Sequence, residues 1–513
     1  MTRSAARILL VVMMMLYRCQ AFLGSHQLSV SKRLFALGAT ISSEATDTTK
    51  KTRSVVVVKR TRQSMEFRKG SQLVFEGAVK YTTGSKPLEL ADIVQVWVEQ
   101  DKSPSSGGGK KGGKGKDGGK KKEKIIEYKH YSEEEAPSPK PNQLIGWGVY
   151  NPNSLYRVRI LCHANLDASL TKSLKADVKM ESILQHKLRA AMLTRQSLGL
   201  PSDGTNTYRL VNGEGDGLSG LAVDILGDLA VVMSSAGWCQ VYRKEITAAL
   251  EELTALKVVW KTTASRLKQD GWENKEEVPE ESSDQAVVTK ESGVLYNTYP
   301  FQDGQKTGVY CDQRENKINL AMLCKDKRVL DLCCYHGGFS FNAKLMGGAS
   351  HCTGVDSSQD AIDVCNENVK LNGISDGNVE FVKDDVDSYM KLAHNESKYF
   401  DVIVLDPPKL APSVSGLERA SRKYQSLNRD AIKLVNPEHG GLLLTCTCSA
   451  AMTQKEGGQF FLQTVQEAAV SAGRQITLLR TSGAASCHTQ SPASYPAGAY
   501  LTAALFYVAP KEE

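Results

Sequence analysis

Short apolar runs alternate with amphipathic segments in the C-terminal part of the chain, from Lys327 onward. The runs have the length of buried strands, whereas the segments between them repeat apolar residues at helical spacing. This alternation is typical of an α/β fold built on a doubly wound, mostly parallel sheet. We predict seven strands, at Arg328–Leu332, Cys352–Val355, Val379–Val382, Val402–Leu405, Gly441–Cys446, Ile476–Leu479 and Tyr500–Val508, and helices near Phe339–Met346, Gln359–Leu371, Ser421–Val435 and Gly458–Ala472.

The two preceding regions have different patterns. Residues 54–165 contain short alternating segments and predict a small all-β domain, with strands at Val55–Val58, Leu73–Phe75, Ile93–Val98, Leu144–Tyr150 and Tyr156–Cys162. Residues 166–298 mix both periodicities and predict an α+β domain. Its expected elements are a helix at Met180–Leu198, a hairpin over Tyr208–Asp224, a strand at Leu229–Ser234, a helix at Cys239–Leu253, a strand at Lys257–Thr262 and an acidic loop at Asp270–Lys290.

One insert accounts for the basic balance of the chain, whose formal net charge is +7. Residues 102–124 contain nine lysines against Asp117 and Glu123, so the remaining sequence is close to neutral. A Gly- and Lys-rich stretch of this kind cannot pack and predicts a flexible surface loop. Such a loop is either solvated without a role or contacts RNA phosphates through charge alone.

Residues 1–53 have the composition of a targeting presequence. Arg3 and Arg7 precede an apolar run, Ile8–Leu16, which suits a signal peptide and is too short to span a bilayer. Residues 24–53 are then rich in Ser, Thr, Lys and Arg, as transit peptides are. A signal-like segment followed by a transit-like one, with Phe22 near the junction, resembles the two-part presequences of complex algal plastids. A mitochondrial presequence is the alternative. No other segment predicts a membrane span.

The twelve cysteines show neither the spacing of a zinc site nor that of a disulfide framework. Cys333 and Cys334 are adjacent, and Cys446 and Cys448 are separated by one residue, so neither pair can form an ordinary disulfide. We therefore expect free thiols in a reducing compartment and no structural metal.

Val402–Lys409 reads Val-Ile-Val-Leu-Asp-Pro-Pro-Lys and is a buried strand that ends on Asp406. Ligands of open α/β sheets bind at the carboxyl ends of the strands, and Pro407 and Pro408 would hold the carboxylate rigidly there. Taken alone, the segment is equally compatible with an acidic turn after a core strand. Its significance depends on the neighbouring strands.

Acidic residues follow three further strands at matching positions. Asp331 precedes a loop that contains Tyr335, Gly337, Gly338 and Phe339, and its glycines would let the backbone approach a ligand. Asp356 ends the next strand, where acids bind ribose hydroxyls, and Asp384 and Asp385 follow the third, where a carboxylate can bond an adenine amino group. Together with Asp406 and Pro407, these residues are typical of the S-adenosylmethionine site of a class I methyltransferase.

The residue after Pro-Pro and the cysteines after the fifth strand bear on which atom is methylated. Enzymes that methylate exocyclic base amines carry an aromatic residue after Pro-Pro, whereas this chain has Lys409. Cytosine C5 is a poor nucleophile unless a thiolate first adds at C6. Cys448, just beyond the strand, fits that nucleophile, and Asp406 would bond N3. Cys446 lies within the strand and is better explained as a buried apolar residue.

With these motifs in place, the chain resembles the bacterial large-subunit ribosomal RNA methyltransferase I family, whose members are 5-methylcytosine enzymes with PUA, EEHEE and methyltransferase domains. The motifs that carry the resemblance are Gly304–Arg314, the hairpin Tyr208–Asp224, Asp406–Lys409, Thr447–Ser449 and Tyr495-Pro496. It extends from about Arg53 to Pro510, outside the insert and the Asp270–Lys290 loop. The chain departs from it at Cys333–His336, where relatives carry Phe-Ser-Tyr-Thr.

The resemblance implies a PUA-like RNA-binding domain at 54–165, an EEHEE-like domain at 166–298 and a Rossmann-like methyltransferase domain at 299–513. It also implies that Lys306, Thr307, Asp312 and Arg314 help to close the cofactor site, and that Cys448 is the nucleophile. The expected substrate is large-subunit ribosomal RNA of an organelle, and a homodimer could form through an exposed sheet edge. Two alternatives are a guanine-N7 methyltransferase, which needs no thiol, and a non-catalytic RNA-binding ribosome-assembly factor.

Overall fold

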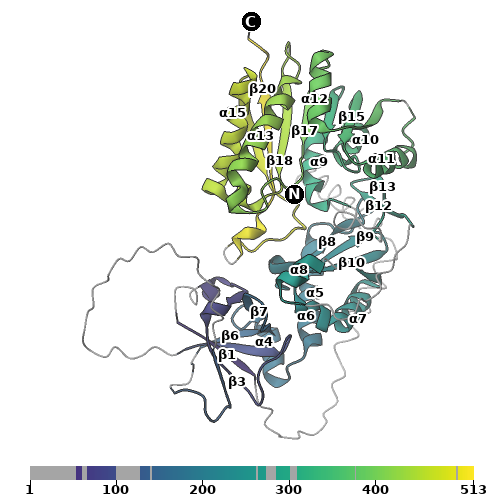
Figure 1. The fold of residues 1–513 in the computed structure, drawn as a ribbon. Helices are drawn as coiled ribbons and strands as arrows, with labels where there is room; N and C mark the ends of the chain where they lie inside the picture. The colour runs from purple at the N-terminus through teal and green to yellow at the C-terminus, as the bar shows by residue number, and fades with distance from the viewer. Residues whose placement is uncertain are drawn as a thin grey trace, which may run out of the picture. The chain divides into compact units, whose positions relative to one another are not determined.

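Four β-sheets organise the part of the chain that the structure, a computed structural model, describes (Figure 1). That part comprises residues 54–60, 66–99, 128–138, 141, 143–261, 264–272, 285–300, 309–375, 377–492 and 495–512. The presequence, the lysine-rich insert, and Lys306 with Thr307 lie outside the described residues. Within the described residues, no helix is long and apolar enough to cross a bilayer.

The first sheet is mixed and has seven strands in the order β2-β7-β6-β4-β1-β3-β5. Their bounds are β1 Val55–Val58, β2 Leu73–Phe75, β3 Val79–Thr83, β4 Ile93–Val98, β5 Lys129–Tyr131, β6 Gln143–Tyr150 and β7 Tyr156–His163. The β-branched residues of β1 and β4 supply much of its core, because Val56, Val58, Val94 and Val96 are buried together. The five predicted strands are confirmed, whereas β3 and β5, which lack a run of consecutive apolar residues, were not predicted.

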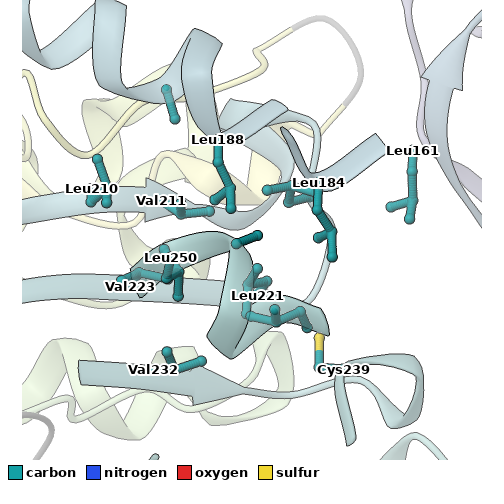
Figure 2. Packing of buried hydrophobic residues seen from close by; sticks show 14 of the residues in the cluster. Leu161, Leu184, Leu188, Leu210, Val211, Leu221, Val223, Val232, Cys239 and Leu250 are labelled. Atoms are coloured by element: carbon teal, nitrogen blue, oxygen red, sulfur yellow. The ribbon is translucent and has the colours of Figure 1, made fainter. Parts of the chain in front are cut away.

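The second sheet has the order β11-β10-β9-β8, and β8 and β9 form the antiparallel hairpin that the sequence predicts. Its strands are β8 Thr207–Asn212, β9 Leu221–Leu226, β10 Leu229–Ser234 and β11 Lys257–Trp260, and the accompanying helices are α4 Ala168–Ala176, α5 Met180–Ser197, α6 Gly237–Val241, α7 Arg243–Thr254 and α8 Ala264–Gln269. The single helix predicted over Cys239–Leu253 is instead two, α6 and α7, interrupted at Tyr242. Figure 2 shows Leu184 and Leu188 of α5 and Leu250 of α7 packed among strand residues of this sheet.

A two-stranded sheet follows, formed by β12 Val287–Glu291 and β13 Val294–Thr298. The loop predicted over Asp270–Lys290 is therefore wrong at its C-terminal end, where the β-branched pair Val287-Val288 begins a strand. The hairpin turns through Ser292 and Gly293, both at positive φ. Its strand β13 is fastened to the end of α11 (Gln359–Leu371), because the amide group of the C-cap residue Asn372 bonds both the N–H and the carbonyl of Leu295.

The C-terminal sheet has seven strands in the order β16-β15-β14-β17-β18-β20-β19. It is mixed, because β20 runs antiparallel to both β18 and β19. The strands are β14 Arg328–Leu332, β15 His351–Asp356, β16 Val379–Lys383, β17 Val402–Leu405, β18 Gly441–Thr447, β19 Ile476–Ser482 and β20 Thr502–Val508. The helices are α9 Arg314–Ala321, α10 Gly338–Leu345, α11 Gln359–Leu371, α12 Val386–Asn395, α13 Leu417–Lys433, α14 Ala450–Gln454 and α15 Gln459–Ala472.

Both faces of this sheet are covered, as its continuous apolar strands require. In β17, Val402 and Val404 belong to a core that includes residues of α9 and α10, whereas Ile403 and Leu405 belong to one that includes residues of α12, α13 and α15. The parallel pairing of β14 with β15 and β17, and of β17 with β18, brings the carboxyl ends of these strands to one edge. The loops that follow them therefore meet there.

The segment between β19 and β20 packs into the core of the second sheet rather than into the sheet from which it emerges. Ala485 and Cys487 are buried among residues of α5, α7 and β8–β10. Arg195 of α5, almost fully buried, pairs with both oxygens of Asp216 and donates to the carbonyl of Cys487 at 2.6 Å. Asn212 also donates to the carbonyl of Thr489 at 2.8 Å.

Candidate active site

A cavity of about 1680 Å³ lies against the carboxyl ends of the C-terminal sheet. Several of the residues that the sequence singles out line it: Tyr335, Gly338, Phe339, Asp356, Asp385, Asp406, Pro407, Cys448 and Asp312. Lining of one space by loops after β14, β15, β16, β17 and β18 is the arrangement expected of a ligand site in an open α/β sheet.

The loop after β14 is unusually constrained, because Cys333, Tyr335 and Gly337 all have positive φ, at 62°, 49° and 72°. Residues other than glycine adopt that conformation at a cost, and such strain concentrates at functional sites. Gly337 is required sterically as well, since a Cβ atom there would lie 2.6 Å from Phe381 and 2.7 Å from Phe341. Gly337 itself does not line the cavity; it lets the loop close over these rings.

Asp356 is held in place by the same loop. Its Oδ2 accepts a hydrogen bond from the backbone N–H of Tyr335 at 3.0 Å, and its Oδ1 accepts one from Ser358 at 3.0 Å. The Tyr335 ring stacks on His336 with centroids 3.7 Å apart and meets Tyr310 edge-on at 4.9 Å. A fixed carboxylate beside an aromatic wall can bind vicinal hydroxyls of a ribose.

Asp331 lies beneath the loop and does not line the cavity. Its Oδ2 accepts hydrogen bonds from the N–H and the hydroxyl of Ser340, at 3.0 and 2.9 Å, which ties β14 to α10. Burial raises its pKa to about 6. The structure thus places Asp331 as a support of the loop rather than at the surface of the cavity.

Asp384 and Asp385 occupy different positions. Asp385 caps α12 by accepting a hydrogen bond from the N–H of Ser388 at 3.1 Å, and it lines the cavity. Asp384 accepts from the N–H of Asp385 at 2.8 Å and does not line the cavity. Of the two, Asp385 is placed to contact a ligand.

Asp406 follows β17 directly. Its backbone N–H donates to the carbonyl of Leu332 at 3.3 Å, and its Oδ2 accepts from Nε2 of Gln313 at 3.0 Å. Pro407, Pro408 and Lys409 continue along the cavity wall. The Asp406 carboxylate therefore lies at the carboxyl edge of the sheet, as the Asp-Pro-Pro sequence predicts.

The two cysteines near the end of β18 differ in exposure. Cys446 has no exposed surface, and burial raises the pKa of its thiol well above the usual value. Cys448 is partly exposed and lines the cavity. Its neighbours hold it in place: Thr447 bonds the Tyr424 hydroxyl at 2.8 Å, and the hydroxyl of Ser449 donates to the carbonyl of Ala411 at 2.5 Å.

Comparisons with known proteins agree with this geometry. A family model described as a methyltransferase domain matches residues 323–480. The ribosomal RNA large subunit methyltransferase I of Klebsiella pneumoniae (strain 342) is 34% identical over 356 residues, which cover 69% of this chain and 84% of that protein. The corresponding protein of Escherichia coli O157:H7 is 33% identical over 355 residues, covering 69% of this chain and 85% of that protein. The chain belongs to the ribosomal RNA large subunit methyltransferase I family.

Solved structures share the fold of this family member. A putative methyltransferase named SMU.776, complexed with SAH, superposes with a TM-score of 0.62 at 19% identity, covering 88% of this chain and 99% of that one. A putative SAM-dependent methyltransferase from Streptococcus mutans gives a TM-score of 0.60 at 20% identity, covering 88% of this chain and all of that one.

S-adenosylmethionine is the cofactor of this methyltransferase, and the described residues fit it. Asp356 offers a fixed carboxylate for ribose hydroxyls, Asp385 offers one for an adenine amino group, and Gly338 brings backbone to the cavity wall. No group of His, Cys, Asp or Glu in the described ranges could hold a metal ion. None of the eleven cysteines described is in a disulfide.

Two residues that the family resemblance implicates are both buried, but only one of them lines the cavity. Asp312 lines the cavity and accepts a hydrogen bond from the Tyr500 hydroxyl at 2.7 Å. Arg314 does not line it; its guanidinium donates to Cys487 Sγ at 3.4 Å, and so it contacts the segment between β19 and β20. Arg314 is thus placed to hold that segment.

Sequence reasoning missed Gln313, Tyr310 and Tyr500 as residues of this methyltransferase site. Gln313 and Tyr310 lie in the Gly304–Arg314 motif, which the sequence analysis associates with the cofactor site as a whole. That motif is the sequence signal from which these two residues could have been predicted. Tyr500 was assigned to a strand, whereas β20 begins at Thr502. Its place in the site follows from the structure, in which it lines the cavity and donates a hydrogen bond to Asp312, 188 residues away in the sequence.

Proposed function

We propose that this protein methylates C5 of a cytosine in large-subunit ribosomal RNA through a covalent bond between Cys448 and C6. The observation that carries the proposal is the contrast between Cys448, which is partly exposed and lines the same cavity as Asp406, and Cys446, which is fully buried. Family membership supports methylation of ribosomal RNA, and it supports the large subunit as the source.

The reaction needs a nucleophile because C5 of cytosine does not attack unaided. As a thiolate, Cys448 Sγ forms a bond to C6, and the electron pair of the C5–C6 double bond becomes available at C5. S-adenosylmethionine supplies a methyl group made electrophilic by its positively charged sulfur. After methylation, a solvent water takes the C5 proton, the electron pair of the C5–H bond re-forms the C5–C6 double bond, and the Sγ–C6 bond breaks so that its electron pair returns to Cys448 as a thiolate. In its protonated form, the Asp406 carboxyl group donates a hydrogen bond to N3 of the base, and it stabilises the adduct by passing this proton to N3 as negative charge develops there.

The first β-sheet is the part that we propose binds the RNA, as a PUA-like domain. Its location before the methyltransferase region agrees with the domain order of the family that the sequence resembles. The ring of its exposed Phe75 lies near that of Tyr156, with the two ring centroids 5.2 Å apart. Rings of this kind suit stacking on unpaired bases.

Methyl transfer in vitro tests the reaction. Protein from residue 54 onward receives labelled S-adenosylmethionine and organellar large-subunit RNA, beside the variants Cys448→Ala and Cys446→Ala. We expect the label in 5-methylcytidine. The rate of methyl transfer should fall at least about a thousandfold in Cys448→Ala and should be retained in Cys446→Ala.

The nucleoside that carries the label separates the alternatives. Label in 7-methylguanosine, unaffected by Cys448→Ala, would replace the proposal with guanine-N7 methylation. Cofactor-independent RNA binding with no transfer would indicate an assembly factor. Label in 5-methylcytidine that depended on Cys446 rather than Cys448 would reassign the nucleophile.

A further inference from the structure

A line of buried hydrogen bonds leads from the end of β19 to the carboxylate of Asp406. The Ser482 hydroxyl donates to Oδ1 of Asn316 at 2.6 Å, Nδ2 of Asn316 donates to Oε1 of Gln313 at 2.6 Å, and Nε2 of Gln313 donates to Oδ2 of Asp406 at 3.0 Å. Gln313 and Asn316 are each only 4% exposed. Water therefore has little access to compete for these bonds.

The direction of these bonds is fixed by a backbone carbonyl. Nδ2 of Asn316 also lies 3.1 Å from the carbonyl oxygen of Gly483, which can only accept a hydrogen bond. The amide nitrogen of Asn316 must face that carbonyl, and the same nitrogen then faces Gln313, whose oxygen must accept. The remaining atom of the Gln313 amide, turned toward Asp406, is consequently its nitrogen.

We infer that Gln313 is a positioning residue for Asp406: it fixes the plane of the carboxylate and commits Oδ2 to accepting a hydrogen bond. This inference rests on the proposed function, because Asp406 is assigned there to the N3 edge of the base. Since Oδ2 is committed as an acceptor, it is not the oxygen that carries a proton toward the adduct. Gln313 acts through Asp406 and does not itself bond to the reacting atoms.

This line of hydrogen bonds connects two elements, α9 and the end of β19. Gln313 ends the short 3₁₀ turn Cys311–Gln313, and Asn316 lies in the first turn of α9. Ser482 and Gly483 lie at the end of β19. This edge strand is separated from β17 by β18 and β20. The orientation of one catalytic carboxylate therefore depends on a contact between α9 and the end of β19.

The test compares Gln313→Glu with a matched control, Gln185→Glu. Glutamate keeps the size of glutamine but replaces the donating nitrogen by an oxygen. Gln185 also donates to a carboxylate, that of Glu252 at 2.7 Å, but on the exposed surface of α5. We expect Gln313→Glu to lower kcat by about tenfold to a hundredfold, with KM for S-adenosylmethionine within about twofold of the wild-type value. Gln185→Glu should leave both unchanged.

A second readout separates positioning from folding. RNA that contains 5-fluorocytidine traps the Cys448 adduct, because C5 then has no proton to lose. We expect Gln313→Glu to slow the formation of this adduct, and Asn316→Asp, which removes the donor to Gln313, to slow it to a smaller extent. Thermal unfolding and cofactor binding should remain close to wild type.

Either of two results overturns the inference: wild-type kcat in Gln313→Glu, or a loss that parallels weaker cofactor binding and a lower melting temperature. Failure of the proposed function has a different signature, because the wild-type protein would then form no 5-methylcytidine and trap no adduct. Each outcome therefore points to one of the two claims.

Discussion

At the scale of single residues, the most unusual carboxyl group is Asp331, which is fully buried and hydrogen bonded to Ser340. Its pKa is raised from 3.8 to about 6, mainly by burial, with a smaller contribution from the charge of Asp356. Between pH 4 and pH 6 the unfolded chain has released this proton while the native protein retains it. The free energy of unfolding therefore loses a contribution as the pH rises through that window.

Asp331→Asn tests this sign, because asparagine does not titrate. Relative to wild type, the unfolding free energy of the variant should rise by about 2–3 kcal/mol between pH 4 and pH 7. Urea unfolding at several pH values measures the difference and cancels the titration of all other groups. A difference that stays flat across the range would show that the pKa of Asp331 is not raised.

At the scale of elements, the loop after β14 depends on Gly337. Alanine there would meet both a positive φ and the rings of Phe341 and Phe381. We expect Gly337→Ala to destabilise the protein by about 2–4 kcal/mol and to weaken S-adenosylmethionine binding by about tenfold, because the loop also carries the N–H that fixes Asp356. Urea unfolding and calorimetric titration measure the two effects.

Gly373 supplies the matched control for this prediction. It also has a positive φ, of 64°, but a Cβ atom there would have open space around it. Gly373→Ala should therefore cost only about 1 kcal/mol and leave cofactor affinity unchanged. Equal effects at the two positions would mean that the aromatic rings near Gly337 move aside and that the loop is less constrained than its contacts imply.

The elements were predictable from sequence where local pattern alone decides them. Strand β17 is a continuous apolar run and β18 contains one, and Asp406 and Cys448 directly follow these two strands, so their convergence could be expected. Helix α12 was not predicted, and the start of α13 was placed four residues late. Contacts such as Gln313 with Asp406, 93 residues apart, leave no periodic trace in the chain. Asp331, Asp384 and Asp385 look alike in sequence, and only packing separates their positions.

At the scale of the whole molecule, we propose that residues 1–53 act as a targeting presequence. We propose delivery to a plastid through the signal-like and transit-like segments in succession. A fluorescent protein fused behind residues 1–53 should enter the plastid of an alga with complex plastids, whereas residues 24–53 alone should leave it outside, since the signal-like part is missing. Fluorescence in mitochondria with the full presequence would contradict the plastid assignment.

The segment between β19 and β20 has a consequence for how this enzyme can be divided. Ala485 and Cys487 complete a core made mostly by residues 144–260, and without this segment Arg195 would lose its hydrogen bond to the carbonyl of Cys487. A fragment cut near residue 299 would therefore expose apolar surface on both sides of the cut. The C-terminal region therefore cannot be transferred on its own as an independently folding domain. A fusion or split enzyme that preserves activity has to keep α5, the β8–β9 hairpin and the last thirty residues together in one folded unit.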